Sequence, residues 1–340
     1  MKARWIDLGE CSPEQYHASY LAVAECMRPD DDPVLVWGQP AAHFCLGVHQ
    51  TAALELVADA GVPVLRRPLG GGGVWIDRQQ VCLVMVAPRQ WFPSRPHDWY
   101  AHALAPMLDV YAGMGWPVQQ VGSDIRLAGR KLAGSGAATI GAAALVGSSF
   151  LLDFPQSTFA SLVSAPSSAF RDWLADALTS QMTCWAAQAT PPAIDWLSLV
   201  YRRAASQHFG WRWEQALLSE PERDASEQLV EELQPHETVS VRRTVPHGIK
   251  IRGGCYLTER HFPDGGVRIL AIDGRLARVW LQQLPDLAGN ALADVLPVAP
   301  DIAARLSEIG AGEIADRLAD MILQTAWLGD DAEYQVMNND

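Results

Sequence analysis

Paired cysteines are missing from this chain of 340 residues. Its six cysteines are scattered, and no Cys-x-x-Cys motif brings two of them together: they are Cys11, Cys26, Cys45, Cys82, Cys184 and Cys255. Zinc sites and disulfide frameworks usually show such spacings, so the sequence argues against both. Unpaired thiols are typical of a reducing compartment, and we expect a cytoplasmic protein.

Long apolar runs and an excess of basic residues are missing as well. No run of about 18 apolar residues occurs, and the first residues lack the charged-then-apolar pattern of a signal peptide, so we expect no contact with a membrane. The chain has 26 Lys and Arg against 39 Asp and Glu, a net charge of −13. An acidic chain repels the phosphate backbone, which argues against a nucleic-acid partner.

Two common nucleotide-binding motifs are absent. The chain has neither the GxxxxGK[ST] pattern of a P-loop nor a GxGxxG that follows a strand and opens a helix. Hydrophobic residues still make up 49% of the chain and charged residues 19%, which is typical of a globular protein with a sizeable core.

The hydrophobic pattern predicts an α+β fold with a main domain over 1–237 and a smaller α+β domain over 238–340. In the first, short strands alternate with helices, and in the second, short strands precede two final helices. Helices are predicted at 12–27, 97–114, 167–188, 195–208, 222–234, 298–308 and 312–327, a continuous strand at 74–86, and a hairpin of strands 267–272 and 275–282.

Four consecutive glycines follow two arginines in the segment Arg66-Arg-Pro-Leu-Gly-Gly-Gly-Gly73. Such a run is either a slack loop or a place where something approaches the backbone too closely for a Cβ atom. Backbone N–H groups without side chains can bind a phosphate or a carboxylate, and an arginine adds bidentate charge. The glycines alone leave both interpretations open.

A second glycine-rich segment, GSDIRLAGRKLAGSG at 122–136, reads as strand, tight turn and strand. Lys131 lies on the returning strand between apolar neighbours, where partial burial makes an ammonium a strong partner for phosphate or carbonyl oxygens. An isolated lysine is more often a solubilising residue on an edge strand, and Asp124 would more often stabilise its own turn. The small apolar residues at 137–152 suit either a slot for an aliphatic chain or, as the pattern favours, a pair of buried strands.

Together, RRPLGGGGVWID (66–77) and GSDIRLAGRKLAGSG (122–136) resemble the two signature segments of the lipoate–protein ligase family, within the biotin/lipoate ligase superfamily. The family has two arginines, a small residue, three glycines, an apolar pair and an aspartate, followed further along by Asn-Asp and Gly-x-Lys. The strand pair ending in Gly47-Val-His-Gln50 and the strand 147–153 also match the family's order. The resemblance covers about residues 30–155 and extends more weakly over 1–235.

This resemblance implies a mixed-sheet catalytic domain of the biotin/lipoate ligase type, followed by a small accessory domain. It also implies a reaction in which ATP activates the carboxylate of lipoate or octanoate as an acyl-adenylate. The acyl group then passes to a lysine of a lipoyl carrier domain or of a glycine-cleavage H-type protein. ATP would bring Mg²⁺, and Asp124 would hold this ion or orient the acceptor lysine.

The resemblance also implies a role for each matched residue. Lys131 is the expected catalytic residue, because it would stabilise charge that develops on carbonyl and phosphate oxygens. Arg67 would neutralise phosphate charge, and the glycines would approach the acyl chain and the nucleotide. The expected substrate- and nucleotide-binding residues are Arg67, Gly71, Gly72, Gly73, Val74, Asp77, Asp124, Gly134 and Ser135.

The chain departs from the family pattern near the substrate. Leu69 and Gly70 stand in place of a small Ser-like residue, Ile76 in place of a histidine, Ser123 in place of an asparagine, and Leu145-Val-Gly147 in place of His-His-Gly. Two alternatives therefore stay open. One is an acyltransferase that moves octanoyl or lipoyl groups between carrier proteins through a cysteine thioester without ATP, which needs a thiol close to the lysine. The other is a non-catalytic protein that binds acyl groups or carriers.

Overall fold

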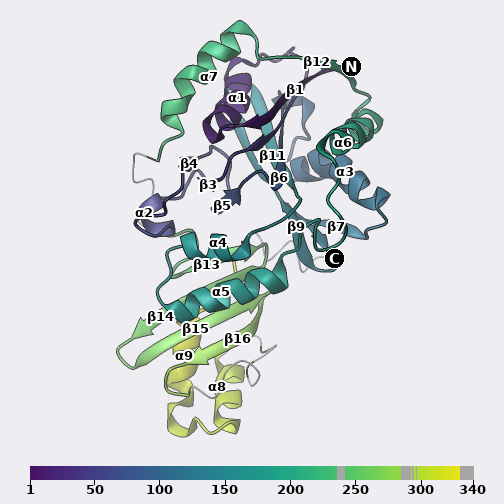
Figure 1. The fold of residues 1–340 in the computed structure, drawn as a ribbon. Helices are drawn as coiled ribbons and strands as arrows, with labels where there is room; N and C mark the ends of the chain where they lie inside the picture. The colour runs from purple at the N-terminus through teal and green to yellow at the C-terminus, as the bar shows by residue number, and fades with distance from the viewer. Residues whose placement is uncertain (236–241, 285–291, 293–294, 296, 330–340) are drawn as a thin grey trace. The chain divides into compact units, whose positions relative to one another are not determined.

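The computed structural model describes residues 1–235, 242–284, 292, 295 and 297–329 (Figure 1). The chain divides into two compact units, and the α+β class predicted from the sequence is confirmed. The first unit comprises Met1–Glu55, Asp59–Pro155 and residues 183–235. The second comprises Leu56–Ala58, Gln156–Met182 and the described residues from Arg242 onwards. Among the helices that the structure describes, none is long and apolar enough to cross a bilayer.

A mixed six-stranded sheet forms the centre of the first unit, in the order β10-β11-β6-β2-β1-β12. Strand β1 pairs in parallel with β2 and β12, whereas β2, β6, β11 and β10 pair antiparallel. The strands are β1 (Lys2–Cys11), β2 (Val34–Pro40), β6 (Gln80–Pro88), β10 (Gly136–Ile140), β11 (Ala143–Leu151) and β12 (Arg212–Gln215).

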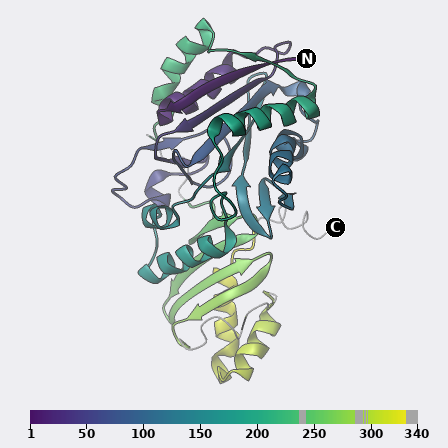
Figure 2. The same ribbon diagram turned by 45° about the vertical axis from the view of Figure 1, so that its right-hand side comes forward.

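Helices cover both faces of this sheet (Figures 1 and 2). On β6, Leu83 and Met85 face a core shared with α3 and α6, whereas Cys82 and Val84 face a core shared with α1 and α7. Because successive strand residues point to opposite faces, a strand buried on both must be apolar throughout, which is how the sequence reads. The helices are α1 (Pro13–Cys26), α3 (Asp98–Gly113), α6 (Ile194–Phe209) and α7 (Glu220–Glu232).

Two three-stranded sheets carry the glycine-rich segments. One has the order β4-β3-β5 and the other β7-β8-β9. Their strands are β3 (His43–Leu46), β4 (Val64–Arg66), β5 (Val74–Ile76), β7 (Val118–Val121), β8 (Asp124–Leu127) and β9 (Arg130–Gly134); the short helix α2 (Ala52–Glu55) and a 3₁₀ turn at Arg89–Trp91 complete the unit.

The predicted continuous strand at 74–86 is wrong. The chain turns at Asp77, whose carboxylate accepts hydrogen bonds from the Trp75 indole at 2.7 Å and the backbone N–H of Gln79 at 2.8 Å. An aspartate that bonds its own backbone two residues on favours a turn. Strands β5 and β6 therefore belong to different sheets.

A bidentate ion pair ties helix α7 to strand β1. The Arg4 guanidinium donates to both carboxylate oxygens of Glu222, at 2.7 Å each. Glu222 also accepts the backbone N–H of Ser219 at 2.7 Å, which completes a capping box at the start of α7. Burial raises the pKa of the Glu222 carboxyl, but the hydrogen bonds from Arg4 and Ser219 outweigh it, and the pKa lies below its ordinary value.

Glu222→Gln tests this link. A carboxyl whose pKa falls on folding stabilises the folded state above its unfolded pKa, and that contribution is lost as pH falls through the lowered value. We expect the substitution to reduce the free energy of unfolding by about 1–2 kcal/mol at neutral pH and by less in acid. Urea titrations at the two pH values measure the difference. A loss of equal size at both would show that the ionised carboxylate is not responsible.

The second unit is built on an antiparallel sheet in the order β13-β14-β15-β16. Helices α8 and α9 pack on one face, against Val267, Ile269 and Ala271 of β15, and the predicted hairpin is present as β15 and β16. The elements are β13 (Gly248–Arg252), β14 (Cys255–Phe262), β15 (Gly265–Ile272), β16 (Arg275–Leu281), α4 (Gln156–Leu162), α5 (Ser168–Gln181), α8 (Ala299–Glu308), a 3₁₀ turn (Gly312–Ile314) and α9 (Ala315–Thr325).

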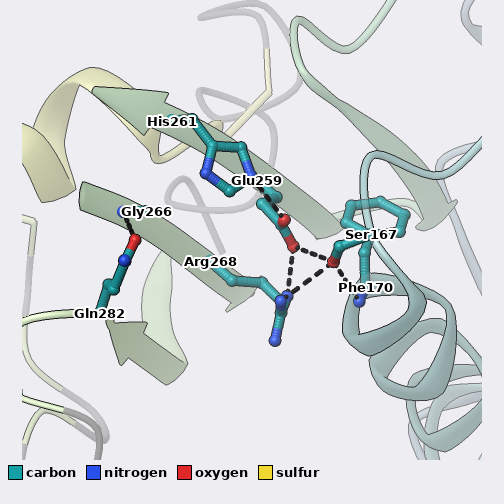
Figure 3. A network of polar contacts seen from close by, with 7 residues as sticks. All are labelled: Ser167, Phe170, Glu259, His261, Gly266, Arg268 and Gln282. Carbon is teal, nitrogen blue, oxygen red and sulfur yellow. Dashed lines mark hydrogen bonds and ion pairs between the residues drawn. The ribbon is translucent and has the colours of Figure 1, made fainter. Parts of the chain in front are cut away.

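A buried polar network joins α5 to the other face of this sheet (Figure 3). The Glu259 carboxylate, whose side chain is 1% exposed, pairs with Arg268 Nε at 2.5 Å and accepts the Ser167 hydroxyl at 2.9 Å. Ser167 also caps α5, since its oxygen accepts the backbone N–H of Phe170 at 3.0 Å. His261 Nε2 contacts the other oxygen of Glu259 at 3.1 Å.

Residues 156–182, which carry Ser167 of this network, lie in the second unit. The predicted boundary between residues 237 and 238 lies outside the described residues, and the sequence assigned 156–182 to the first domain. In the structure, these residues belong to the second unit. Buried polar groups must be paired, and the partners of Ser167 and Gln181 lie on the C-terminal sheet, at Glu259 and Arg252.

Candidate functional site

Backbone approaches too close for side chains shape the glycine loop at 70–73. A Cβ atom at Gly47 would overlap the carbonyl oxygen of Gly71, and one at Gly73 would overlap the Phe44 ring. Gly71 has φ +93°, a conformation that side chains rarely adopt. Gly70 and Gly72 have nothing within 4 Å of such an atom. Within the run, the fold therefore requires glycine at 71 and 73, whereas a side chain at 70 or 72 would meet open space.

The Arg67 side chain donates hydrogen bonds to the backbone of this loop. Its Nη1 donates to the Cys45 carbonyl at 2.8 Å, and its Nη2 donates to the carbonyls of Gly70 at 3.2 Å and Gly72 at 2.8 Å. The residue is only 8% exposed. In this structure the guanidinium orders the loop, and its expected contact with phosphate stays a prediction.

Lys131 and Asp124 form an ion pair, with 3.0 Å between Nζ and Oδ1. The lysine side chain is 21% exposed and the aspartate side chain 5%, so the ion pair is largely shielded from water. A Cβ at Gly134 would lie 2.5 Å from Nζ, so the end of the lysine side chain packs over this glycine. The Asp124 carboxylate thus faces Lys131 in the folded chain.

The two glycine-rich segments meet at Gly136, just after the strand that carries Lys131. A Cβ at Gly136 would lie 3.1 Å from the Gly70 carbonyl oxygen and 3.2 Å from Leu69 Cβ. The Leu69 side chain continues onto β11, where its Cδ1 would lie 2.9 Å from a Cβ at Gly147. Leu69 is 5% exposed. The departure from the family pattern at Leu69 is thus accommodated by two glycines facing it.

The remaining predicted site residues take structural positions around this junction. Val74 is half-buried on β5 and pairs with Cys45 in register. Asp77 forms the turn described above. The Ser135 hydroxyl donates to the Ser148 hydroxyl at 3.2 Å, which in turn donates to the Gly134 carbonyl at 3.1 Å. These contacts order the end of β9 next to Lys131.

Sequence reasoning missed two residues that the structure brings to this region. Gln50 accepts the Gly47 backbone N–H at 3.0 Å and so fixes the strand end that receives the glycine loop. The Gly-x-x-Gln pattern at 47–50 could have identified this residue from the sequence. Cys184 follows Thr183, whose backbone N–H donates to the Lys131 carbonyl at 2.8 Å. No local motif marks this thiol, because the contact joins segments far apart in sequence.

A buried cluster behind the loop was also missed. His17 on α1 lies with His43 and Cys45 on β3, and all three are buried. Burial lowers the pKa of both imidazoles, that of His43 to about 4, and raises the pKa of the Cys45 thiol, against the opposing charge of Arg67. His43 and Cys45 are two residues apart on a strand and so share a face, but nothing in the sequence places His17 beside them.

Alanine substitutions can separate the two kinds of glycine. Gly47→Ala forces a Cβ into the Gly71 carbonyl, and we expect it to lower the free energy of unfolding by about 1–3 kcal/mol. Gly72→Ala has open space and should change stability by less than about 0.5 kcal/mol. Thermal unfolding measures both. Equal melting temperatures for the two variants would contradict the close approach of the two backbones.

Several solved structures have a similar fold. A bi-partite lipoate protein ligase from Thermoplasma acidophilum superposes with a TM-score of 0.64 at 17% identity, covering 72% of this chain and 100% of that chain. Lipoate-protein ligase A bound with ATP gives 0.59 at 16%, covering 68% and 95%. LipL1 of P. falciparum in complex with lipoate gives 0.55 at 12%, covering 95% and 99%. At these identities the likeness shows the fold.

The family is shown by sequence. A comparison with curated protein sequences gives no significant match. The family model of the lipoyl protein ligase A/B catalytic domain, however, matches residues 17–195, which is more than half of the chain and includes the glycine loop and Lys131. The resemblance seen in the signature segments is confirmed, and the chain belongs to the lipoyl protein ligase A/B catalytic domain family.

Proposed function

We propose that this protein is an ATP-dependent lipoate–protein ligase, which activates lipoate or octanoate as acyl-AMP and transfers the acyl group to a lysine of a lipoyl carrier domain. The observation that carries the proposal is the junction at Gly136, where the glycine loop meets the start of β10, two residues after the strand of Lys131 ends. Adenylation brings two anions together, a carboxylate and an α-phosphate, and needs both cationic charge and free backbone N–H groups at one place.

The residues of the junction suit the two steps. In the first, a carboxylate oxygen of the acid attacks the α-phosphorus of ATP and pyrophosphate leaves. Lys131, held by Asp124, would stabilise the charge that builds on phosphate and carbonyl oxygens, and the open backbone at Gly72 would lie along the ligands. In the second, the acceptor lysine attacks the acyl carbonyl and AMP leaves. Asp124 is the expected protein ligand of the Mg²⁺ that accompanies ATP.

The solved relatives support the choice of ligands. One is lipoate-protein ligase A bound with ATP, another is a Thermoplasma acidophilum protein with bound lipoic acid, and a third was studied with its E2 lipoyl domain. We extend these ligands to the present chain as part of the proposal. All six cysteines are free thiols, which suits the reducing cytoplasm as its compartment.

ATP–pyrophosphate exchange tests the first step, and a mass shift of a purified carrier domain tests the second. We expect exchange that depends on lipoate or octanoate and on Mg²⁺, followed by addition of one acyl group to the carrier. Running the two acids in parallel identifies the preferred one. Absence of exchange with both acids would overturn the ligase assignment.

A second candidate function rests on Cys184. An acyltransferase that acts through a thioester needs a thiol close to the lysine. Cys184 follows Thr183, whose backbone N–H contacts the carbonyl of Lys131, and this is the observation that favours this function. Against it, burial raises the pKa of the Cys184 thiol, and the Asp153 carboxylate at 3.6 Å raises it further, which disfavours the nucleophilic thiolate. Acyl transfer between carriers without ATP, abolished in Cys184→Ser, would favour this function over the ligase.

A further inference from the structure

The buried cluster behind the glycine loop has three side chains that can ligate a metal. His17 Nε2 and His43 Nε2 are 3.0 Å apart, and together with Cys45 Sγ they lie within 4.8 Å of one another. The histidines are 2% and 0% exposed and the cysteine 0%. Two ring nitrogens bound to one metal at about 2.0 Å lie about 3.3–3.5 Å apart, so the two imidazoles need to separate by only a few tenths of an ångström to hold one ion between them.

The outer nitrogen of each imidazole already has the partner that a ligating histidine requires. His43 Nδ1 lies 2.7 Å from the Ala41 carbonyl and must donate to it, which leaves its Nε2 with a lone pair. His17 Nδ1 lies 2.9 Å from the Tyr20 hydroxyl, which can either donate or accept. The pair is satisfied without metal by a His17 N–H donated to His43. Moving that one proton to Nδ1, with the Tyr20 hydroxyl turned to accept it, frees both Nε2 atoms for a metal.

We propose that His17, His43 and Cys45 form a three-coordinate site for a monovalent soft cation, Cu(I). On binding, the Cys45 thiol loses its proton to solvent, one sulfur–copper bond and two nitrogen–copper bonds form, and no electron is transferred. Thiolate and imidazole ligands in a trigonal arrangement suit copper.

Charge and ligand number favour Cu(I) over Zn²⁺. The Arg67 guanidinium lies next to the cluster, with Nη1 2.8 Å from the Cys45 carbonyl oxygen. Cu(I) and a thiolate sum to no net charge, whereas Zn²⁺ would add an uncompensated positive charge beside a buried arginine. Structural zinc sites are almost always four-coordinate. Among the residues that the structure describes, the group of His, Cys, Asp and Glu ligands at this place has three members.

Competition with a chromophoric Cu(I) chelator under anaerobic, reducing conditions tests the proposal on the full chain. We expect one Cu(I) per chain, with zinc bound at least about tenfold more weakly. X-ray absorption should show two nitrogens and one sulfur around the copper. Tyr20→Phe removes the outer partner of His17 and should weaken binding about 10- to 100-fold, because such partners orient the ligating ring.

Cys45→Ser should abolish stoichiometric binding. The matched control is Cys82→Ser, because Cys82 is a buried thiol in the same core, on β6; this variant should bind copper as the parent does. Failure of the parent chain to take copper from the chelator would overturn the site, as would binding retained in Cys45→Ser. If Cys45→Ser does not fold, the absorption spectrum of the parent decides: a copper environment with two or more sulfurs contradicts the proposed ligands.

Discussion

Replacing Lys131 with alanine is expected to lower the rate of ATP–pyrophosphate exchange by about 10²–10³-fold, the loss seen when one preorganised group that stabilises developing charge is removed. The Lys131 side chain lies on the strand that precedes the junction at Gly136, is 21% exposed and pairs with the Asp124 carboxylate at 3.0 Å. The neighbouring cation on β9, Arg130, points to the opposite face of the strand, and the fold should tolerate replacement of a side chain that is 21% exposed.

Lys2→Ala is the matched control. Lys2 also pairs with a carboxylate, that of Glu214 at 2.8 Å, but both side chains are more than half exposed at the edge strand pair β1–β12. This variant should exchange pyrophosphate at the parent rate. Exchange that persists in Lys131→Ala at the parent rate would remove the lysine from the mechanism, whereas loss of melting temperature together with activity would indicate a structural role.

The largest effect on stability is expected from Arg268→Met in the second unit. Arg268 and Glu259, which form the ion pair drawn in Figure 3, are 5% and 1% exposed. The arginine also lies over the rings of Trp173 and Trp280. Removing one partner of a buried pair leaves an uncompensated buried charge, which costs about 3–5 kcal/mol. Urea unfolding of the full chain should show this loss in the transition of the second unit.

A double variant and an exposed control make the test specific. Because Glu259→Gln removes the orphaned charge, Arg268→Met combined with Glu259→Gln should be more stable than Arg268→Met alone. Arg278 also lies over the Trp173 ring and pairs with Asp176 at 3.1 Å, but these side chains are 36% and 70% exposed. Arg278→Met should therefore cost at most about 1 kcal/mol. Equal losses for Arg268→Met and Arg278→Met would contradict the role of burial.

Local patterns in the sequence determined the family, the α+β class and most elements. The glycine run, the Gly-Arg-Lys turn and their order along the chain resemble the family's signature segments, and β6 could be recognised as a doubly buried strand from its apolar run. Where a turn depends on one side chain, local pattern failed: the hydrogen bonds of Asp77 divide what reads as one strand.

What only the tertiary structure decided are the contacts between segments far apart in sequence. Gly47 must be glycine because of Gly71, and Leu69 fits because Gly136 and Gly147 face it. Residues 156–182 belong to the unit of the C-terminal sheet, where Ser167 donates to Glu259. The cluster of His17, His43 and Cys45 also joins segments that are far apart in sequence. Sequence periodicity describes which face a residue takes, but the neighbour on that face is set by packing, which no local pattern encodes.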